Sequence, residues 1–149
     1  KNCYGVWESG YTSTEADPRG IEADGNLDGI YPDHLRQSDF AVENMTIVNN
    51  AANTTDNVDR MQDVIKIRRG AKATITNALA KGSGGTIDLI DMNDSKGAGN
   101  AASSISITHT LNFKNKLNGT LNTFTEPTTN AGADASLFTW SGYDFSSLL

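Results

Sequence analysis

The sequence predicts an all-β solenoid, in which short strands wind in one direction and stack on one another. The first observation behind this prediction is the period of two in residues 63–82, where Ile65 and Ile67 alternate with Lys66 and Arg68. Such alternation places apolar side chains on one face of a strand and charged side chains on the other. The second observation is that similar strand pairs recur along the chain, which is typical of a solenoid.

Each repeat consists of two strands joined by a bend. In the central copy, Gly70 interrupts the run, Ala73 and Ile75 alternate with threonines, and Gly82 ends the unit. The other strand pairs are predicted at residues 19–25 with 40–48 and 86–92 with 104–113, and residues 2–6 match the end of a further copy. The connections are predicted at residues 7–18, 26–39, 49–62 and 93–103, with a helical turn at 58–61 and a glycine-rich turn at 83–85.

Stacking the predicted copies gives two core columns, each with an outward column beside it. The first core column is Ile21, Ile65 and Ile87, beside Glu22, Lys66 and Asp88. The second core column is Val42, Ile75 and Ile107, beside Asn44, Asn77 and His109. The asparagines suit a bend, because asparagine tolerates left-handed backbone angles and stacked amides can hydrogen-bond to each other.

The last part of the chain departs from the repeat. We expect the coils to occupy residues 1–113, and residues 114–149 to contain an irregular strand at 117–124 and a C-terminal cap. The aromatic ending predicts the cap, because the last coil of a solenoid otherwise exposes apolar side chains and strand edges. The alternative is that these aromatic residues form a platform for a sugar. The apolar residues concerned are Leu137, Phe138, Trp140, Tyr143 and Phe145.

Composition excludes several classes of partner. Twelve basic and eighteen acidic residues give a net charge of −6, whereas nucleic acids and anionic membranes require a basic surface. No apolar run approaches the roughly 18 residues of a membrane span. A single cysteine, Cys3, allows no internal disulfide. The chain starts in what resembles the end of a strand, so we expect it to be the C-terminal piece of a longer protein.

Four stretches carry a resemblance to a known group of proteins. They are DPRGIEADGNLDG (17–29), VIKIRRGAKATITNALAKG (64–82), LIDMNDSKGAGN (89–100) and FTWSGYDF (138–145). The chain resembles the C-terminal part of the right-handed parallel β-helix proteins that Bacteroidetes secrete or display on the outer cell surface. This resemblance implies a right-handed parallel β-helix of about three coils with a C-terminal cap. Because the family is largely uncharacterised, it implies no catalytic residues; larger pectate-lyase-like relatives cleave polysaccharides.

One loop carries a candidate calcium site. Asp24, Asn26 and Asp28 in DGNLDG match the first half of a calcium-binding loop, which needs several oxygen ligands on a flexible turn. The twelfth position of the loop is Leu35, where an EF-hand requires a bidentate glutamate. Aspartate, asparagine and glycine also make ordinary tight turns, so a plain turn is the alternative.

Two groups of residues are candidates for binding a polysaccharide. Trp7, Tyr11 and Tyr31 lie in the long loops, where their rings can stack on sugars. Lys66 and Arg68 can neutralise the carboxylate of a uronate. The alternatives are that the aromatic residues cover the side of a coil, and that the cations form ion pairs between neighbouring coils, which contribute roughly 0–1 kcal/mol each when exposed.

The function that these features favour is non-enzymatic. We expect a secreted or cell-surface binding or scaffold protein, with carbohydrate as the candidate ligand and an upstream segment or partner covering the N-terminal coil. One alternative is part of a polysaccharide lyase or glycoside hydrolase; another is a self-assembling structural element. The histidines lack ligand spacing for zinc, and no serine-nucleophile or phosphate-binding motif is present.

Overall fold

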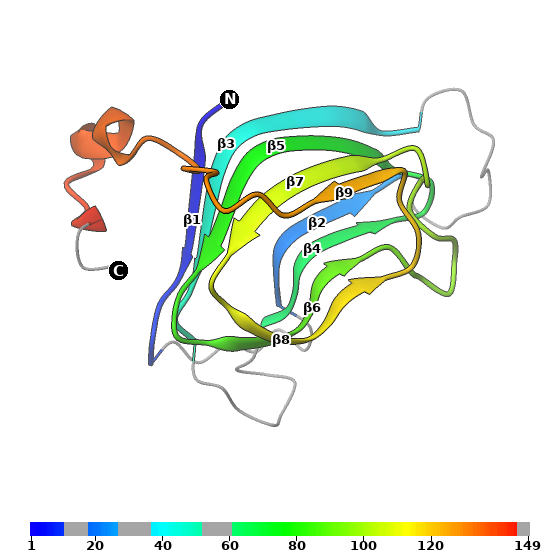
Figure 1. Cartoon of the computed structure of the whole chain (residues 1–149), viewed down its shortest axis with the longest axis horizontal. Coiled ribbons are helices and arrows are strands. Elements are labelled where there is room, and N and C mark those ends of the chain that lie inside the picture. Colours follow the sequence, from blue (N-terminus) through cyan, green and yellow to red (C-terminus); the bar gives the residue numbers. More distant parts are fainter. Residues whose placement is uncertain (11–17, 27–36, 52–60, 146–149) are drawn as a thin grey trace.

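The computed structural model describes residues 1–10, 18–26, 37–51 and 61–145. Within these ranges the chain is all-β, apart from one short 3-10 helix near the C-terminus (Figure 1). The elements are β1 (Cys3–Trp7), β2 (Arg19–Asp24), β3 (Asp39–Asn49), β4 (Met61–Arg68), β5 (Lys72–Lys81), β6 (Gly85–Asp91), β7 (Ser104–His109), β8 (Asn112–Asn118), β9 (Thr123–Thr125) and the 3-10 helix η1 (Ala135–Ser141). No helix in the described ranges is long and apolar enough to cross a membrane.

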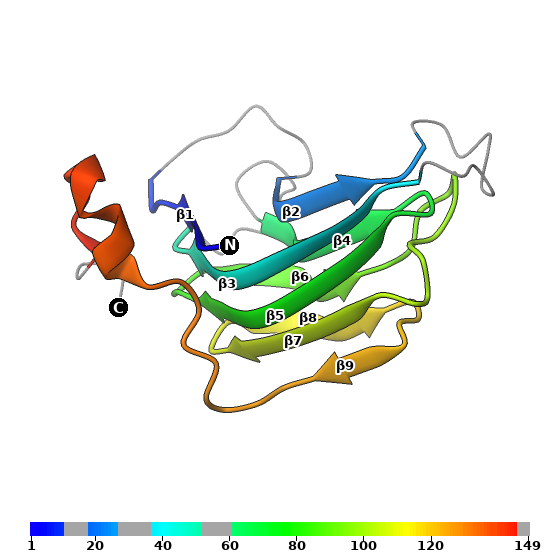
Figure 2. The same ribbon diagram turned by 90° about the horizontal axis from the view of Figure 1, so that it is seen from above.

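The strands form two sheets, and the chain alternates between them. The first sheet has the order β1-β3-β5-β7-β9, and the second has the order β2-β4-β6-β8. All neighbouring strands in both sheets run parallel. Figure 2 shows the resulting stack, which runs from β1 and β2 at one end to β8 and β9 at the other. Each strand therefore pairs with the strand two places further along the sequence.

The core lies between the two sheets. Ile65 and Ile67 of β4 and Ala73 and Ile75 of β5 are fully buried, which confirms the alternation predicted from residues 63–82. Burying one isoleucine side chain stabilises a fold by about 1.5–3 kcal/mol. Leucine and isoleucine side chains from β6 and β7, together with Met92 directly after β6, extend this core along the stack.

The first predicted core column is half right. Ile21 pairs with Ile65 as expected, but Ile65 pairs with Ile90 rather than Ile87. The correct alignment places Asp63 opposite Asp88, so Asp91 and not Asp88 follows Lys66 in the outward column. The prediction failed because it assumed strict alternation, whereas Leu89 and Ile90 are consecutive and both fully buried.

The second predicted core column is also half right. Val42 pairs with Ile75 as expected, but Ile75 pairs with Ile105 instead of Ile107. The pairing of β5 with β7 shifts between Ile75 and Ala78, because β7 has one residue fewer at the bend. As a consequence, His109 lies opposite Ala80 and does not continue the column of asparagines.

The predicted boundaries also need correction after residue 104. The segment 104–113 is not one strand, because β7 ends at His109 and β8 begins at Asn112 in the other sheet. The irregular strand expected at 117–124 is divided between the end of β8 and the short β9. Of the helical turn expected at 58–61, Met61 belongs to β4, and residues 58–60 lie outside the described ranges.

After β9 the chain turns back toward the start of the stack. We call residues 126–145 the C-terminal strap. Both views show it passing from β9 to the side of β1, where η1 lies (Figures 1 and 2). Its rings contact Tyr4 of β1, with ring centroids 6.1 Å away for Phe138 and 4.7 Å away for Phe145. The aromatic tail thus packs against the first strand, not over the last coil where the cap was expected.

Candidate functional site

A cavity of about 390 Å³ lies where the C-terminal strap meets the end of β1. We call it the aromatic cavity, and the described residues that line it are Val6, Trp7, Glu8 and Tyr143. The hydroxyl of Tyr143 donates a hydrogen bond to Oε1 of Glu8, 135 residues away in sequence. The cavity therefore combines two aromatic rings with a carboxylate, and its walls come from both ends of the chain.

The sheet fixes the N-terminal wall of the aromatic cavity. Trp7 is the last residue of β1 and pairs with Asn49 of β3. Its carbonyl oxygen accepts a hydrogen bond of 2.8 Å from the backbone nitrogen of Asn50. Its neighbour Val6 pairs with Val48, which is fully buried. The ring of Trp7 is thus carried by a strand that is anchored to the core.

Local backbone geometry and ring packing fix the other wall. Gly142 has a φ of 70° at the end of η1, which turns the chain out of the helix. The backbone nitrogen of Tyr143 then donates to Oγ of Ser141 at 3.2 Å. The ring centroids of Tyr143 and Phe145 lie 5.2 Å apart, and Phe145 in turn contacts Tyr4. Tyr143 is consequently held by a cluster of rings that packs against β1.

The electrostatics of the aromatic cavity follow from the bond between Glu8 and Tyr143. The hydrogen bond to Glu8 raises the pKa of Tyr143, because losing the proton would place a phenolate beside a carboxylate. Burial raises the pKa of the neighbouring Tyr4. Both hydroxyls therefore stay protonated at neutral pH, and Tyr143 continues to donate its hydrogen bond to Glu8.

A second cluster of polar side chains lies on the outer face of the second sheet. Each strand of this sheet carries two polar residues that lie three positions apart in sequence. Strand pairing aligns these polar residues in two columns. We call this arrangement the polar ladder. Its levels are Arg19 and Glu22, Asp63 and Lys66, Asp88 and Asp91, and Asn115 and Asn118.

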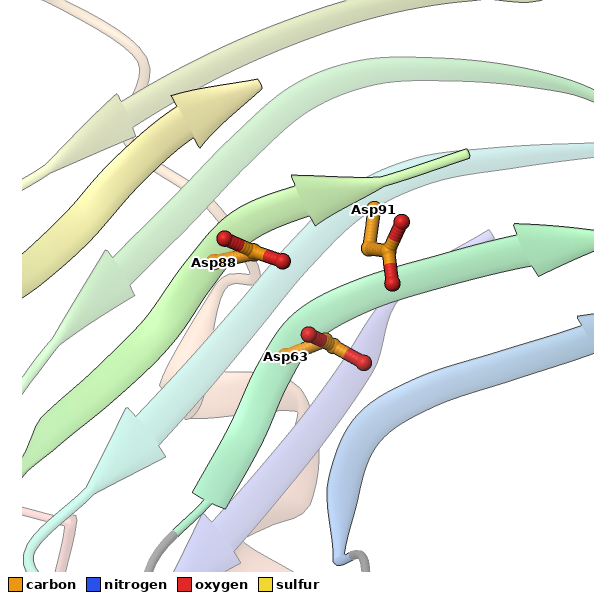
Figure 3. A group of neighbouring side chains, drawn as sticks. All are labelled: Asp63, Asp88 and Asp91. Carbon is orange, nitrogen blue, oxygen red and sulfur yellow. The ribbon is translucent and has the colours of Figure 1, made fainter. Parts of the chain in front are cut away.

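A bend in the strands explains why residues three apart converge. Val64 and Ile65 are both fully buried, as are Leu89 and Ile90. Two consecutive inward side chains force the residues before and after them to the outside. Figure 3 shows the result for Asp63, Asp88 and Asp91, which lie on the concave side of the bend in β4 and β6. One carboxylate oxygen from each lies within 4.8 Å of the others.

Each of the three carboxylates has a partner: two form ion pairs with cations, and the third accepts a hydrogen bond from an amide. Arg19 Nε donates to Asp63 at 2.9 Å, and Lys66 forms a buried ion pair with Asp91. Asn115 donates to Asp88 at 2.6 Å. Burial raises the pKa of Asp63, and the hydrogen bond from Arg19 only partly offsets it. Because Arg19 and Lys66 already supply positive charge, the cluster fits an internal ion-pair network better than a metal site.

The structure places the predicted ligand-binding residues in different surroundings. Trp7 lines the aromatic cavity, whereas Tyr11 and Tyr31 lie outside the described ranges. Lys66 is paired with Asp91, and its side chain is only 8% exposed. Arg68 forms ion pairs with Glu22, Asp24 and Asp94. Both cations therefore form ion pairs with residues of neighbouring strands, as the alternative to ligand binding expected.

The candidate calcium residues are only partly described. Asp28 lies outside the described ranges. Asp24 forms ion pairs with Arg68 and, at 3.3 Å, with Arg69, and the backbone nitrogen of Asn26 donates to the Arg69 carbonyl. A carboxylate shared by two guanidinium groups offers little net charge to a calcium ion, so Asp24 fits a turn that is tied to β4 better than it fits a calcium ligand.

Several residues of these two sites were not identified as site residues from the sequence. Glu8 and Tyr143 are 135 positions apart, and no local pattern relates them. Asp63 and Asp91, by contrast, belong to a detectable pattern of polar residues three apart that recurs in RGIE, DVIK, DLID and NKLN. The polar ladder therefore left a recurring signal in the sequence, although the predicted register missed it, whereas the aromatic cavity left none.

Comparison with known proteins gives no relative. No family model, curated protein or solved structure matches this chain. The function must therefore be argued from the two sites that its own residues form.

Proposed function

We propose that this chain is a right-handed parallel β-helix module of a secreted or outer-surface protein, and that it binds carbohydrate without acting on it. Alternation of the chain between two parallel sheets supports the β-helix, since each strand pair then makes one coil. Crossover connections between parallel strands of one sheet are right-handed in about 98% of cases, which supports a right-handed β-helix. Sequence resemblance to Bacteroidetes surface proteins supports the location.

The aromatic cavity carries the binding proposal. Sugar rings present apolar C–H faces that pack on aromatic rings and hydroxyls that donate to carboxylates. Trp7 and Tyr143 supply rings, and Glu8 supplies the acceptor. A neutral sugar fits best, because Glu8 would repel a uronate and the cations Lys66 and Arg68 are engaged in ion pairs.

The open end of the stack supports the proposal that a further segment or partner covers the first coil. Among the described residues, β1 and β2 each have a strand neighbour on one side only. A second cavity of about 140 Å³ lies between them, and Val6, Ile47 and Met61 contribute to its apolar lining. Unpaired strand edges beside apolar surface are typically covered by additional protein.

Calorimetric titration with a panel of neutral oligosaccharides tests the binding proposal. We expect Trp7→Ala to weaken binding at least about tenfold, a loss of about 1.4 kcal/mol. Trp140→Ala is the matched control, because Trp140 is 82% exposed and does not line the aromatic cavity. Equal loss in both variants, or no binding by the native chain, would refute the proposed site.

Two further measurements address the alternatives. Appearance of reducing ends or unsaturated products on incubation with polysaccharides would replace the binding proposal with a hydrolase or a lyase. Light scattering that shows concentration-dependent growth of the particle would favour the self-assembling element. We expect neither the products nor the growth.

A further inference from the structure

We infer that the C-terminal strap is the closing element of the aromatic cavity. Docked on the first sheet, it brings Tyr143 to Trp7; released, it removes one wall of the cavity. The part of this inference that concerns a ligand rests on the proposed carbohydrate site, whereas the docking itself does not. Contacts along the whole strap support the inference.

The strap follows a single column of outward side chains down the first sheet. Strand pairing places Tyr4, Thr46, Leu79 and Thr108 in one column, one residue from each strand. Thr108 Oγ1 donates to the carbonyl of Pro127 and accepts from the backbone nitrogen of Asn130 at 3.1 Å. The strap therefore begins its return path on β7, close to β9.

The middle of the strap binds the next two strands in order. On β5, Asn77 Oδ1 accepts from the backbone nitrogen of Ala131 at 2.9 Å. On β3, Thr46 Oγ1 accepts from the backbone nitrogen of Ala133 at 2.9 Å. Thr46 is 1% exposed and Ala133 is 9% exposed, so the strap covers the column completely at this level. Backbone amides of the strap are thus satisfied by side chains of the sheet.

Gly132 allows this close approach. It has a φ of 71°, and a Cβ placed there would lie 2.8 Å from Cβ of Leu79 and closer still to Oγ1 of Thr46. Gly142 has almost the same φ, 70°, but a Cβ there would meet nothing within 4 Å. The two glycines consequently share one backbone requirement and differ in whether they face the sheet.

The end of the strap is anchored on β1. Phe138 and Phe145 contact the ring of Tyr4, and Tyr143 then reaches Glu8. Glu126, at the start of the strap, is bound by His109 at 2.7 Å and by Lys116 at 2.9 Å. The strap is therefore fastened at both ends, and the position of Tyr143 depends on every contact between them.

The matched variants Gly132→Ala and Gly142→Ala test this inference. Each is made in a Trp140→Phe background, which leaves Trp7 as the one tryptophan of the chain. We expect Gly132→Ala to exchange the amide hydrogens of Ala131 and Ala133 at least about tenfold faster than Gly142→Ala does. We also expect red-shifted Trp7 emission and at least about tenfold weaker sugar binding in Gly132→Ala than in its Trp140→Phe parent.

Two controls keep the test decisive. Unchanged exchange at Ile75, in the core, shows that the coils of Gly132→Ala remain folded. Phe145→Ala is a second variant, which removes a ring contact with Tyr4 without adding a Cβ against the sheet. We expect it to reproduce the emission shift of Trp7.

The possible outcomes separate the two proposals. Equal exchange at Ala131 and Ala133 in the two glycine variants, or Trp7 emission in Gly132→Ala that matches its Trp140→Phe parent, overturns the inference. Faster exchange with unchanged sugar affinity also overturns it, because the cavity would not need the strap. If the native chain binds no sugar but exchange and emission respond as expected, the strap closes the cavity and the carbohydrate proposal alone fails.

Discussion

Asn77 donates a hydrogen bond of 2.8 Å from its Nδ2 to Oδ1 of Asn44. The two residues occupy the same bend on neighbouring strands, and both have left-handed backbones, with φ of 51° and 57°. Asparagine is among the few residues that adopt this conformation readily. Asn77 also accepts from the strap through Oδ1, so one side chain connects β5, β3 and the strap.

The bend at Asn77 predicts an unequal effect of two substitutions. We expect Asn77→Ala to lower the free energy of unfolding by about 2–5 kcal/mol, since left-handed alanine costs about 1–2 kcal/mol and the lost hydrogen bonds to Asn44 and Ala131 about 0.5–1.5 kcal/mol each. Asn77→Gly should lose only the hydrogen bonds. Urea unfolding measures both values. Equal values for the two variants would contradict a role for the left-handed backbone.

The buried pair of Lys66 and Asp91 predicts a strong dependence of each residue on the other. Both side chains are less than 10% exposed. We expect Lys66→Met to cost about 3–5 kcal/mol, because it leaves a buried carboxylate without its cation. The double variant Lys66→Met with Asp91→Asn should recover much of this loss. Additive losses in a double-mutant cycle would show that the pair is not coupled.

The contact of Asn115 with Asp88, at the β8 end of the polar ladder, predicts that a second carboxylate at position 115 would be repelled by Asp88. Asn115 Nδ2 donates to Asp88 Oδ1 at 2.6 Å. Asn115→Asp replaces this donor with a second carboxylate, and we expect it to lower the free energy of unfolding at neutral pH by about 1–3 kcal/mol. Asn115→Ala is the control that removes the donor without adding charge. If Asn115→Asp is no worse than Asn115→Ala, the register between β6 and β8 is wrong.

The anchor of the strap at Glu126 predicts a pH dependence. Burial opposes ionisation of Glu126, but hydrogen bonds from Lys116 and His109 outweigh it, so its pKa lies below the usual 4.5. A carboxyl with a lowered pKa contributes stability above its unfolded pKa, and this contribution disappears as the pH falls through the folded value. Strap docking should therefore weaken below about pH 4.5.

Glu126→Gln provides the measurement for this anchor. The variant lacks the titrating group, so the difference in free energy of unfolding between native and variant chains should shrink as the pH falls from about 6 to 3. Amide exchange at Ala131 reports the same loss within the strap. A difference that stays constant over this range would show that the ion pairs of Glu126 do not hold the strap.

Much of the fold could be predicted because local patterns encode it. The alternation around Ile65 and Ile75 identified the strands of the central coil, and the repeated asparagines identified the bend at Asn44 and Asn77. Register beyond the central coil could not be predicted in the same way. Leu89 and Ile90 both face the core at a bend, and a search for strict alternation therefore selects Ile87.

The candidate sites show the same difference between what local sequence predicts and what long-range contacts decide. Trp7 was expected to bind a ligand, and it lines the aromatic cavity, although binding itself stays a prediction. Glu8 and Tyr143 could not be paired, because their contact depends on the strap turning back along the stack. Lys66 and Arg68 were candidates for binding a ligand, with ion pairs as the alternative, and their burial and ion pairs depend on which acidic residues the neighbouring strands supply.

The sequence by itself determined the strands, the bends and the all-β class, because a period of two and the tolerance of asparagine for left-handed angles are properties of short segments. Only the tertiary structure decided which isoleucines stack, where the aromatic tail packs and which side chains meet around the cavity. Those outcomes depend on contacts between residues tens of positions apart, and their energies arise only when the two sheets are assembled.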